Sequence, residues 1–191
     1  MGLRPSKCYK WDNRAYTRIS NNPADSFITG IPGSKISRFE MGNLSGEFDT
    51  ELCLVTTDRI QLRHNCLEAS RIVANNILQK NLGLSNYRFK IRVFPHHVLR
   101  ENITATGAGA DRVSDGMRRA FGKPIGTAAR LTKGQKVFSI YVNSDAESMK
   151  HAKKAMKIAM AKLPDVIKLV VKPVAKTEAK PAENKNQHTL P

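Results

Sequence analysis

Hydrophobic residues recur at helical spacing in the stretch that ends at Gly83. Five apolar residues lie three or four positions apart and share one helix face: Leu62, Cys66, Ala69, Val73 and Ile77. Asp58 and Gln61 form a pair that resembles a capping box, and glycine is a typical residue just after a helix end. The pattern therefore predicts a helix over 58–82.

A second helix is predicted from Ser144 to Pro164, with Glu147 in the capping-box position. One face is apolar and comprises Met149, Ala152, Met156, Ala159 and Leu163. The opposite face is basic and comprises Lys150, His151, Lys153, Lys154 and Lys157. Two interpretations of this basic face stay open: a weak contact with a polyanion, or an ordinary solvated helix surface.

Apolar and polar residues alternate, with the period of a half-buried strand, in six further stretches: 35–41, 51–56, 87–94, 127–131, 136–142 and 166–171. These strands fall in neighbouring hairpin-like groups, and only two helices accompany them. A doubly wound parallel sheet would need more crossover helices. We therefore predict an α+β fold with a mainly antiparallel sheet.

Three segments stand apart from these elements. Residues 95–126 are rich in glycine and show little helix or strand pattern, which predicts a long loop, and loops of that length are usually functional. Residues 1–20 form a basic N-terminal arm, and residues 172–191, which hold no aromatic residue, are expected to be a disordered tail. The single domain is expected over 21–171.

The overall charge points to a polyanionic partner. The 191 residues include 32 Lys+Arg and 16 Asp+Glu, a formal net charge of +16. Nucleic acid is the first candidate and an anionic membrane surface the second. Because aromatic residues make up only 6% of the chain, recognition of structured RNA through its phosphates fits better than stacking of successive single-stranded bases.

The charge is concentrated in two regions. Residues 40–86 contain six acidic and four basic residues, a net charge of −2. The arm has five bases, Arg4, Lys7, Lys10, Arg14 and Arg18, interleaved with Tyr9, Trp11 and Tyr16. Between Arg88 and Lys136 there are eleven bases against three acids. We expect these two regions to be the contact surfaces.

Other chemistry finds little support in the sequence. Cys8, Cys53 and Cys66 are widely spaced, which argues against a disulfide framework or a zinc site, and Cys66 is expected to be the most buried. His96 and His97 are adjacent, so on a strand they point to opposite faces and do not readily share one metal ion. We expect no catalytic residue, no cofactor and no metal. No stretch approaches the roughly 18–20 apolar residues of a membrane span, and the start has no signal-type apolar run, so we expect a cytoplasmic protein without a membrane partner.

Three motifs in order along the chain resemble one protein family. They are RPSKCYKWDNRAYTR (4–18), FKIRVFPHHVLREN (89–102) and GAGADRVSDGMRRAFGKPIGTAAR (107–130). The family is the large-subunit ribosomal protein L-ten-e of archaea and eukaryotes, the counterpart of bacterial L-sixteen, and the resemblance extends from Arg4 to about Val171. The chain lacks the long C-terminal extension of eukaryotic members, so the archaeal type fits best.

This resemblance implies a two-layer α+β sandwich with two helices, an extended arm and a long protruding Gly/Arg-rich loop. It also implies a place at the base of the central protuberance, with large-subunit ribosomal RNA, transfer RNA and other large-subunit proteins as partners. Residues expected to bind ribosomal RNA are Arg4, Lys7, Lys10, Trp11, Arg14, Arg18, Arg88, Arg92, Arg100, Arg118, Arg119, Lys123 and Arg130. Residues expected in the loop near transfer RNA are Asn102, Thr104, Gly107, Ala108, Gly109, Ala110, Asp111 and Arg112.

The function expected on these grounds is that of a non-enzymatic constituent of the large ribosomal subunit, which binds its RNA and supports transfer-RNA positioning in translation. The alternative is a free-standing regulator or chaperone that binds structured RNA through the same basic surface. An RNA-modifying enzyme is a third, remoter possibility, because the sequence shows no cofactor pocket.

Overall fold

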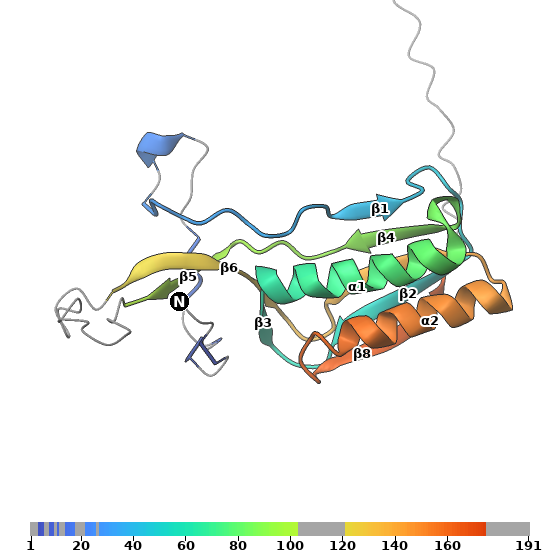
Figure 1. Cartoon of the computed structure of the whole chain (residues 1–191). Helices are drawn as coiled ribbons and strands as arrows, with labels where there is room; N and C mark the ends of the chain where they lie inside the picture. Colours follow the sequence, from blue (N-terminus) through green and yellow to red (C-terminus); the bar gives the residue numbers. More distant parts are fainter. Residues whose placement is uncertain are drawn as a thin grey trace, which may run out of the picture.

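The structure is a computed structural model in which residues 4–5, 8–9, 11, 14–17, 22–25, 27–102 and 121–174 are described (Figure 1). Two helices are present among these residues, α1 (His64–Leu82) and α2 (Ala146–Met160), together with two short 3-10 turns, η2 (Pro23–Asp25) and η3 (Leu84–Asn86). Neither helix is both long and apolar enough to cross a bilayer, within this described part of the chain.

In the described part of the chain, eight strands form two antiparallel sheets. The five-stranded sheet has the order β1 (Glu40–Gly42), β4 (Tyr87–Ile91), β7 (Lys136–Val142), β2 (Thr50–Thr56) and β8 (Ile167–Pro173). The three-stranded sheet has the order β3 (Ile60–Arg63), β6 (Lys123–Leu131) and β5 (His97–Glu101). Every strand pair in both sheets is antiparallel.

Both helices pack side by side on one face of the five-stranded sheet, which gives two layers (Figure 1). Strand alternation turns Leu52, Phe89, Phe138 and Ile140 toward the helices, and each is fully buried. The rings of Phe89 and Phe138 meet edge to face, 5.5 Å apart. The α2 side of this core consists mainly of small residues, which let the helix approach the sheet closely: Ala152, Ala155, Met156 and Ala159. Burial of a Leu, Ile or Phe side chain contributes about 1.5–3 kcal/mol.

The predicted fold class is confirmed, but the first helix begins later than predicted. Residues Ile60–Arg63 form strand β3, which pairs with β6, and α1 begins at His64. The N-cap residue Arg63 makes no side-chain capping hydrogen bond. The position of Leu62 fits the apolar spacing of both a helix and a strand. It lies in a strand because this segment pairs with β6.

The loop predicted over 95–126 has a strand at each end. Strand β5 occupies 97–101 and β6 begins at Lys123, so the connection between them is 102–122. Sequence reasoning missed β5 because its two buried apolar residues, Val98 and Leu99, are adjacent and do not alternate. Gly122 closes the connection with φ +79°, and a Cβ there would lie 2.6 Å from the backbone of Glu101.

Two smaller expectations also change. The strand predicted over 35–41 is limited to β1, residues 40–42. Cys53 is the fully buried cysteine, whereas Cys66 is half-buried. Cys53 lies on central strand β2, and its thiol is 3.8 Å from the Ser139 hydroxyl of β7.

Candidate nucleic-acid interface

The first basic region is the arm side, which we define as arm residues 4–17 together with the three-stranded sheet on which they lie. The arm pairs with the edge strand β5 through Tyr16. The Tyr16 backbone N–H donates to His97 Nδ1 at 2.9 Å, and the Val98 N–H donates to the Tyr16 carbonyl at 2.8 Å. These two bonds give the arm a fixed register on the small sheet.

Three arginines of the small sheet stack on arm aromatics, one from each strand. Their guanidinium carbons lie 4.3–4.7 Å from the ring centroids in the pairs Arg63–Tyr9, Arg130–Trp11 and Arg100–Tyr16. Arg130 also donates a hydrogen bond to the Trp11 carbonyl. A guanidinium that stacks on a ring keeps N–H groups at its edge for phosphate contacts. The arm is thus attached by the residue type that also binds RNA.

The loop root, where β5 and β6 leave the sheet, contacts the same arm. Phe121 meets Tyr16 edge to face at 5.5 Å, and the Arg100 guanidinium contacts both rings, 4.7 Å from the Tyr16 centroid and 3.7 Å from the Phe121 centroid. Arg4 forms an ion pair with Glu101 at 3.3 Å. The position of the arm and the position of the loop root are therefore linked through these side chains.

Two histidines at the small sheet have lowered pKa values. Burial lowers the pKa of His97, and the nearby Arg130 and Arg100 charges lower it further. Burial likewise lowers the pKa of His64, whose Nδ1 lies 3.1 Å from the Thr127 hydroxyl. Because His97 Nδ1 accepts the Tyr16 N–H, a proton on that nitrogen would remove the acceptor.

The second basic region is the open sheet face, the face of the five-stranded sheet turned away from α1 and α2. Strand alternation places six basic side chains on it: Arg88, Lys90, Arg92, Lys136, Lys168 and Lys172. Its two carboxylates are Glu40 and Glu51. Across the described residues, neither helix lies on this face (Figure 1).

Each carboxylate of the open sheet face bridges two bases. Glu40 accepts from Arg88 at 2.9 Å and from Lys90. Glu51 pairs with Lys136 at 2.7 Å and with Arg92 at 3.3 Å. Each group of three charges keeps a net charge of +1 and holds its bases in place on rigid strands.

The charge state of Glu51 is fixed by its surroundings. Burial raises the pKa of this carboxyl, but hydrogen bonds from Lys136, Ser139 and Cys53 outweigh burial and bring the pKa to about 2. The Tyr141 hydroxyl adds a further hydrogen bond to Glu51 at 3.1 Å. Glu51 is therefore ionised at any physiological pH.

The structure divides the predicted RNA-binding residues between these two regions. Arg4, Trp11, Arg14, Arg100, Lys123 and Arg130 lie on the arm side or at the loop root, whereas Arg88 and Arg92 lie on the open sheet face. The predictions for Lys7, Lys10, Arg18, Arg118 and Arg119 fall outside the described residues, as do those for Thr104, Gly107, Ala108, Gly109, Ala110, Asp111 and Arg112. Asn102 is described and follows β5 directly.

Sequence reasoning did not assign four of the open-face bases, Lys90, Lys136, Lys168 and Lys172. A signal was present, because Arg88 and Lys90, and Lys168 and Lys172, lie an even number of residues apart on their strands. The basic residues of α2, Lys150, Lys153, Lys154 and Lys157, are exposed on the opposite side of the molecule.

Comparisons with known proteins place the chain among close relatives. The family model described as ribosomal protein L16p/L10e matches residues 12–170. A protein of Methanocella arvoryzae named large ribosomal subunit protein uL16 is 51% identical over 172 residues, which cover 90% of this chain and 95% of that protein. Proteins of the same name from Sulfolobus acidocaldarius and Archaeoglobus fulgidus are 47% and 44% identical, and the matches cover 94% and 90% of this chain and 99% and 94% of those proteins.

Proposed function

The chain belongs to the ribosomal protein L16p/L10e family in its archaeal form, and from that premise we propose that it binds large-subunit ribosomal RNA in the cytoplasm as a structural constituent of the large ribosomal subunit. Other large-subunit proteins would be its neighbours there. The role is one of assembly and positioning and not of catalysis. We propose one domain over residues 21–171, with the arm 1–20 before it and the tail 172–191 after it, although strand β8 continues into the first residues of that tail and ends at Pro173.

The observation that supports RNA binding most strongly is the open sheet face. Six bases and two carboxylates share this face, and the carboxylates hold four of the bases by ion pairs. An RNA backbone that docks here meets cations already in position, so little side-chain entropy is lost on binding. Each phosphate that is neutralised by a protein base releases its counterions, and this release adds a salt-dependent contribution to affinity.

The arm side supplies a second RNA contact. The stacked guanidinium groups of Arg63 and Arg130 each donate one bond to an arm carbonyl, and a guanidinium has further N–H groups for phosphates; Arg100 and Lys123 extend this basic surface to the loop root. Tyr9 and Trp11 each use one ring face on arginine, so any base that stacks on them would use the other face.

Transfer-RNA positioning is the finer part of the proposal. It rests on the family resemblance of the loop 102–113, and the β5–β6 hairpin supports it because a two-stranded root with Gly122 at its closure is a rigid base for an extension. The deletion of residues Thr104–Asp111 tests this role. The shortened protein should stay folded, as measured by circular dichroism and thermal melting, but ribosomes that contain it should be impaired in translation. Loss of folding would contradict a role for this loop as a functional extension.

Binding itself is tested with the full chain and fragments of large-subunit ribosomal RNA over a series of salt concentrations. We expect the logarithm of affinity to fall linearly with the logarithm of salt concentration, by roughly 0.7–0.9 per neutralised phosphate. Affinity that stays flat with salt would contradict the proposal. In a sucrose gradient at high salt the chain should stay with large subunits, whereas a free-standing regulator would wash off.

A further inference from the structure

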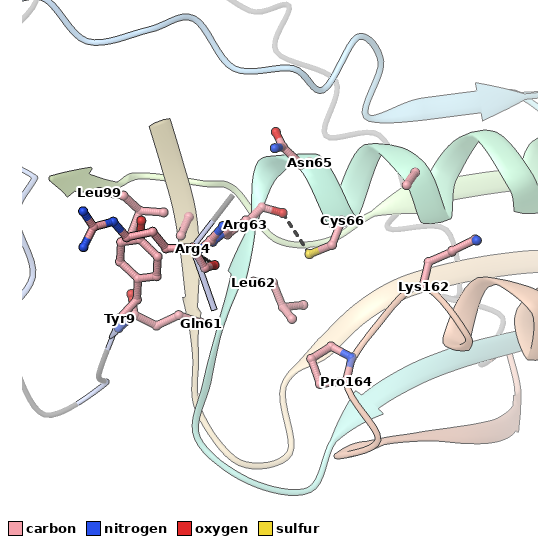
Figure 2. Close-up of a pocket in the computed structure, with 12 residues that line it drawn as sticks. Arg4, Tyr9, Gln61, Leu62, Arg63, Asn65, Cys66, Leu99, Lys162 and Pro164 are labelled. Carbon is pink, nitrogen blue, oxygen red and sulfur yellow. Dashed lines mark hydrogen bonds between the residues drawn. The ribbon is translucent and has the colours of Figure 1, made fainter. Parts of the chain in front are cut away.

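A pocket of about 560 Å³ lies beside the arm, where the start of α1 comes near the connection from α2 to β8 (Figure 2). Five separate parts of the chain line it: the arm, β3, the first turns of α1, the β5–β6 pair, and residues 162–164. Its volume is in the range of small-molecule and cofactor sites. It belongs to neither the open sheet face nor the loop root.

The walls of the pocket are mainly apolar. They are formed by Leu62, Ala69, Leu99, Ala128 and Pro164, and Figure 2 shows Leu62 between Leu99 on one side and Pro164 on the other. Leu62, Leu99 and Ala128 are almost fully buried, so these walls are part of the packed domain. An apolar surface of this kind favours a flat, uncharged ring over water.

Three cations border the same pocket, and no acidic residue is among its lining residues in the described structure. Arg4 and Arg63 lie at the arm end, and Lys162 lies across from them, after the end of α2 (Figure 2). The N-terminal turn of α1 adds to this positive field, because it contains no acidic residue and its cap residue makes no side-chain capping bond. The pocket is therefore matched in charge to an anionic group.

Two residues that line the pocket each have a buried side-chain oxygen with no hydrogen-bond partner among the described residues, Tyr9 Oη and Asn65 Oδ1. One can donate a hydrogen bond and the other can accept one. Beside them the Arg63 guanidinium lies over the Tyr9 ring at 4.3 Å, which gives a planar surface at the pocket wall. A ligand with a ring and a polar edge would use both features.

We propose that this pocket binds one unpaired nucleotide of large-subunit ribosomal RNA, with the base between the apolar walls and its phosphate at the Lys162 end. This inference rests on the proposed RNA-binding function and adds to it a defined site for a base taken out of the stack. Arg4 already pairs with Glu101, but an apolar protein side chain would leave Arg63 and Lys162 without a counter-charge at the pocket. A free phosphate would leave the apolar walls empty. A nucleotide satisfies both, as unstacked RNA bases commonly do on arginine and aromatic planes.

The test uses the full chain and large-subunit ribosomal RNA, with affinity and nucleotide-resolution chemical probing as readouts. Ala69→Phe fills the pocket from an exposed position on α1, and Lys162→Ala removes the cation at the α2 end. The matched controls are Gln79→Phe and Lys80→Ala, exposed positions of α1 that do not line the pocket. Melting temperatures should be the same for all four variants within a few degrees.

We expect Ala69→Phe to weaken RNA binding about tenfold and to raise the chemical reactivity of a single unpaired nucleotide. Lys162→Ala should weaken binding less, at the same nucleotide, and the controls should match the wild type. Wild-type affinity and an unchanged reactivity pattern in Ala69→Phe would overturn the inference. Unchanged RNA reactivity with loss of a neighbouring ribosomal protein from the subunit would also overturn it and assign the pocket to a protein chain. If the wild type itself failed to bind the RNA, the proposed function would be wrong instead.

Discussion

The open sheet face and the arm side both present bases to solvent, but different interactions hold those bases. On the open sheet face, Glu40 and Glu51 bridge bases that project from paired strands above a fully buried core. On the arm side, the bases are held through stacks and hydrogen bonds with an arm whose described residues are at most half-buried. The sheet face is therefore preformed by the fold, whereas the arm side depends on docking of the arm.

The interactions that hold the docked arm are individually weak. Three arginine–aromatic stacks at about 0.5–1 kcal/mol each and the two hydrogen bonds of the Tyr16 backbone at about 0.5–1.5 kcal/mol each stabilise the docked arm by roughly 2.5–6 kcal/mol before its ordering entropy is counted. Fixing about ten residues costs at least as much. The arm can thus dock and undock without unfolding of the domain, and RNA can select the docked state.

The largest effect on the free energy of unfolding is expected from a substitution in the core between the five-stranded sheet and the helices. Phe138→Ala should lower the free energy of unfolding by about 3–5 kcal/mol, because the fully buried ring also packs on Phe89. Chemical denaturation followed by circular dichroism measures this change. Leu84→Ala is the control, since Leu84 is 56% exposed and its loss should cost less than about 0.5 kcal/mol. Equal effects at both positions would contradict the assigned core.

An intermediate effect on the free energy of unfolding is expected from a substitution of Glu51. Its lowered pKa means that its contribution to stability is present above about pH 4.5 and is lost as the pH falls toward 2. Glu51→Gln removes the counter-charge of Arg92 and Lys136 and should cost about 1–3 kcal/mol at neutral pH. Unfolding curves at several pH values should show a shallower loss of stability between pH 4.5 and 2 in the variant. Parallel pH profiles for variant and wild type would contradict the bridging role.

A smaller effect on stability is expected from the arm. Trp11→Ala removes the stack with Arg130, so it should speed tryptic cleavage at Arg14 while it changes the melting temperature by only a few degrees. Leu44→Ala, at an exposed position outside the arm, is the matched control. A variant that melts like Phe138→Ala would show that the arm belongs to the core, and the distinction between the two regions would fail.

The smallest effect is expected from pH near neutrality. His97 has a pKa below 6.5, so the docked arm is fully stabilised above about pH 6.5 and loses this stabilisation as the pH falls through the lowered pKa. Trp11 is the only tryptophan of the chain, and its fluorescence therefore reports docking directly. A fluorescence change below pH 6.5 that disappears in His97→Asn is the expected outcome. Fluorescence that stays constant from pH 7.5 to 5.5 would contradict the role of His97.

Much of this architecture could be predicted from local patterns, and the exceptions have physical causes. Strand β4 alternates clearly, β2 and β7 are short and mainly apolar stretches, and α2 has an apolar face next to a basic one. The apolar spacing predicts a helix at β3 because the position of Leu62 fits both helical and strand spacing. Only pairing with strand β6 determines the conformation. Local sequence does not reveal which distant strands become neighbours.

Charge counting predicted two basic regions, but the structure divides the second of them, 88–136, between the arm side and the open sheet face. Charge counting located the arm and the segment after Arg88. It could not pair Glu51 with Lys136, 85 residues away, because that contact depends on the register between β2 and β7. Nor could it show that Arg63, Arg100 and Arg130 would stack on the arm, because these residues come together only when three strands form the small sheet.

The central claim is that the bases of the open sheet face bind ribosomal RNA. The most direct measurement is the salt dependence of RNA affinity for the double variant Lys168→Glu/Lys172→Glu on β8, beside the wild type and Lys80→Glu on α1. Loss of two phosphate contacts should reduce the slope of log affinity against log salt by roughly 1.4–1.8, while Lys80→Glu keeps the wild-type slope. Identical slopes for all three proteins would contradict the claim.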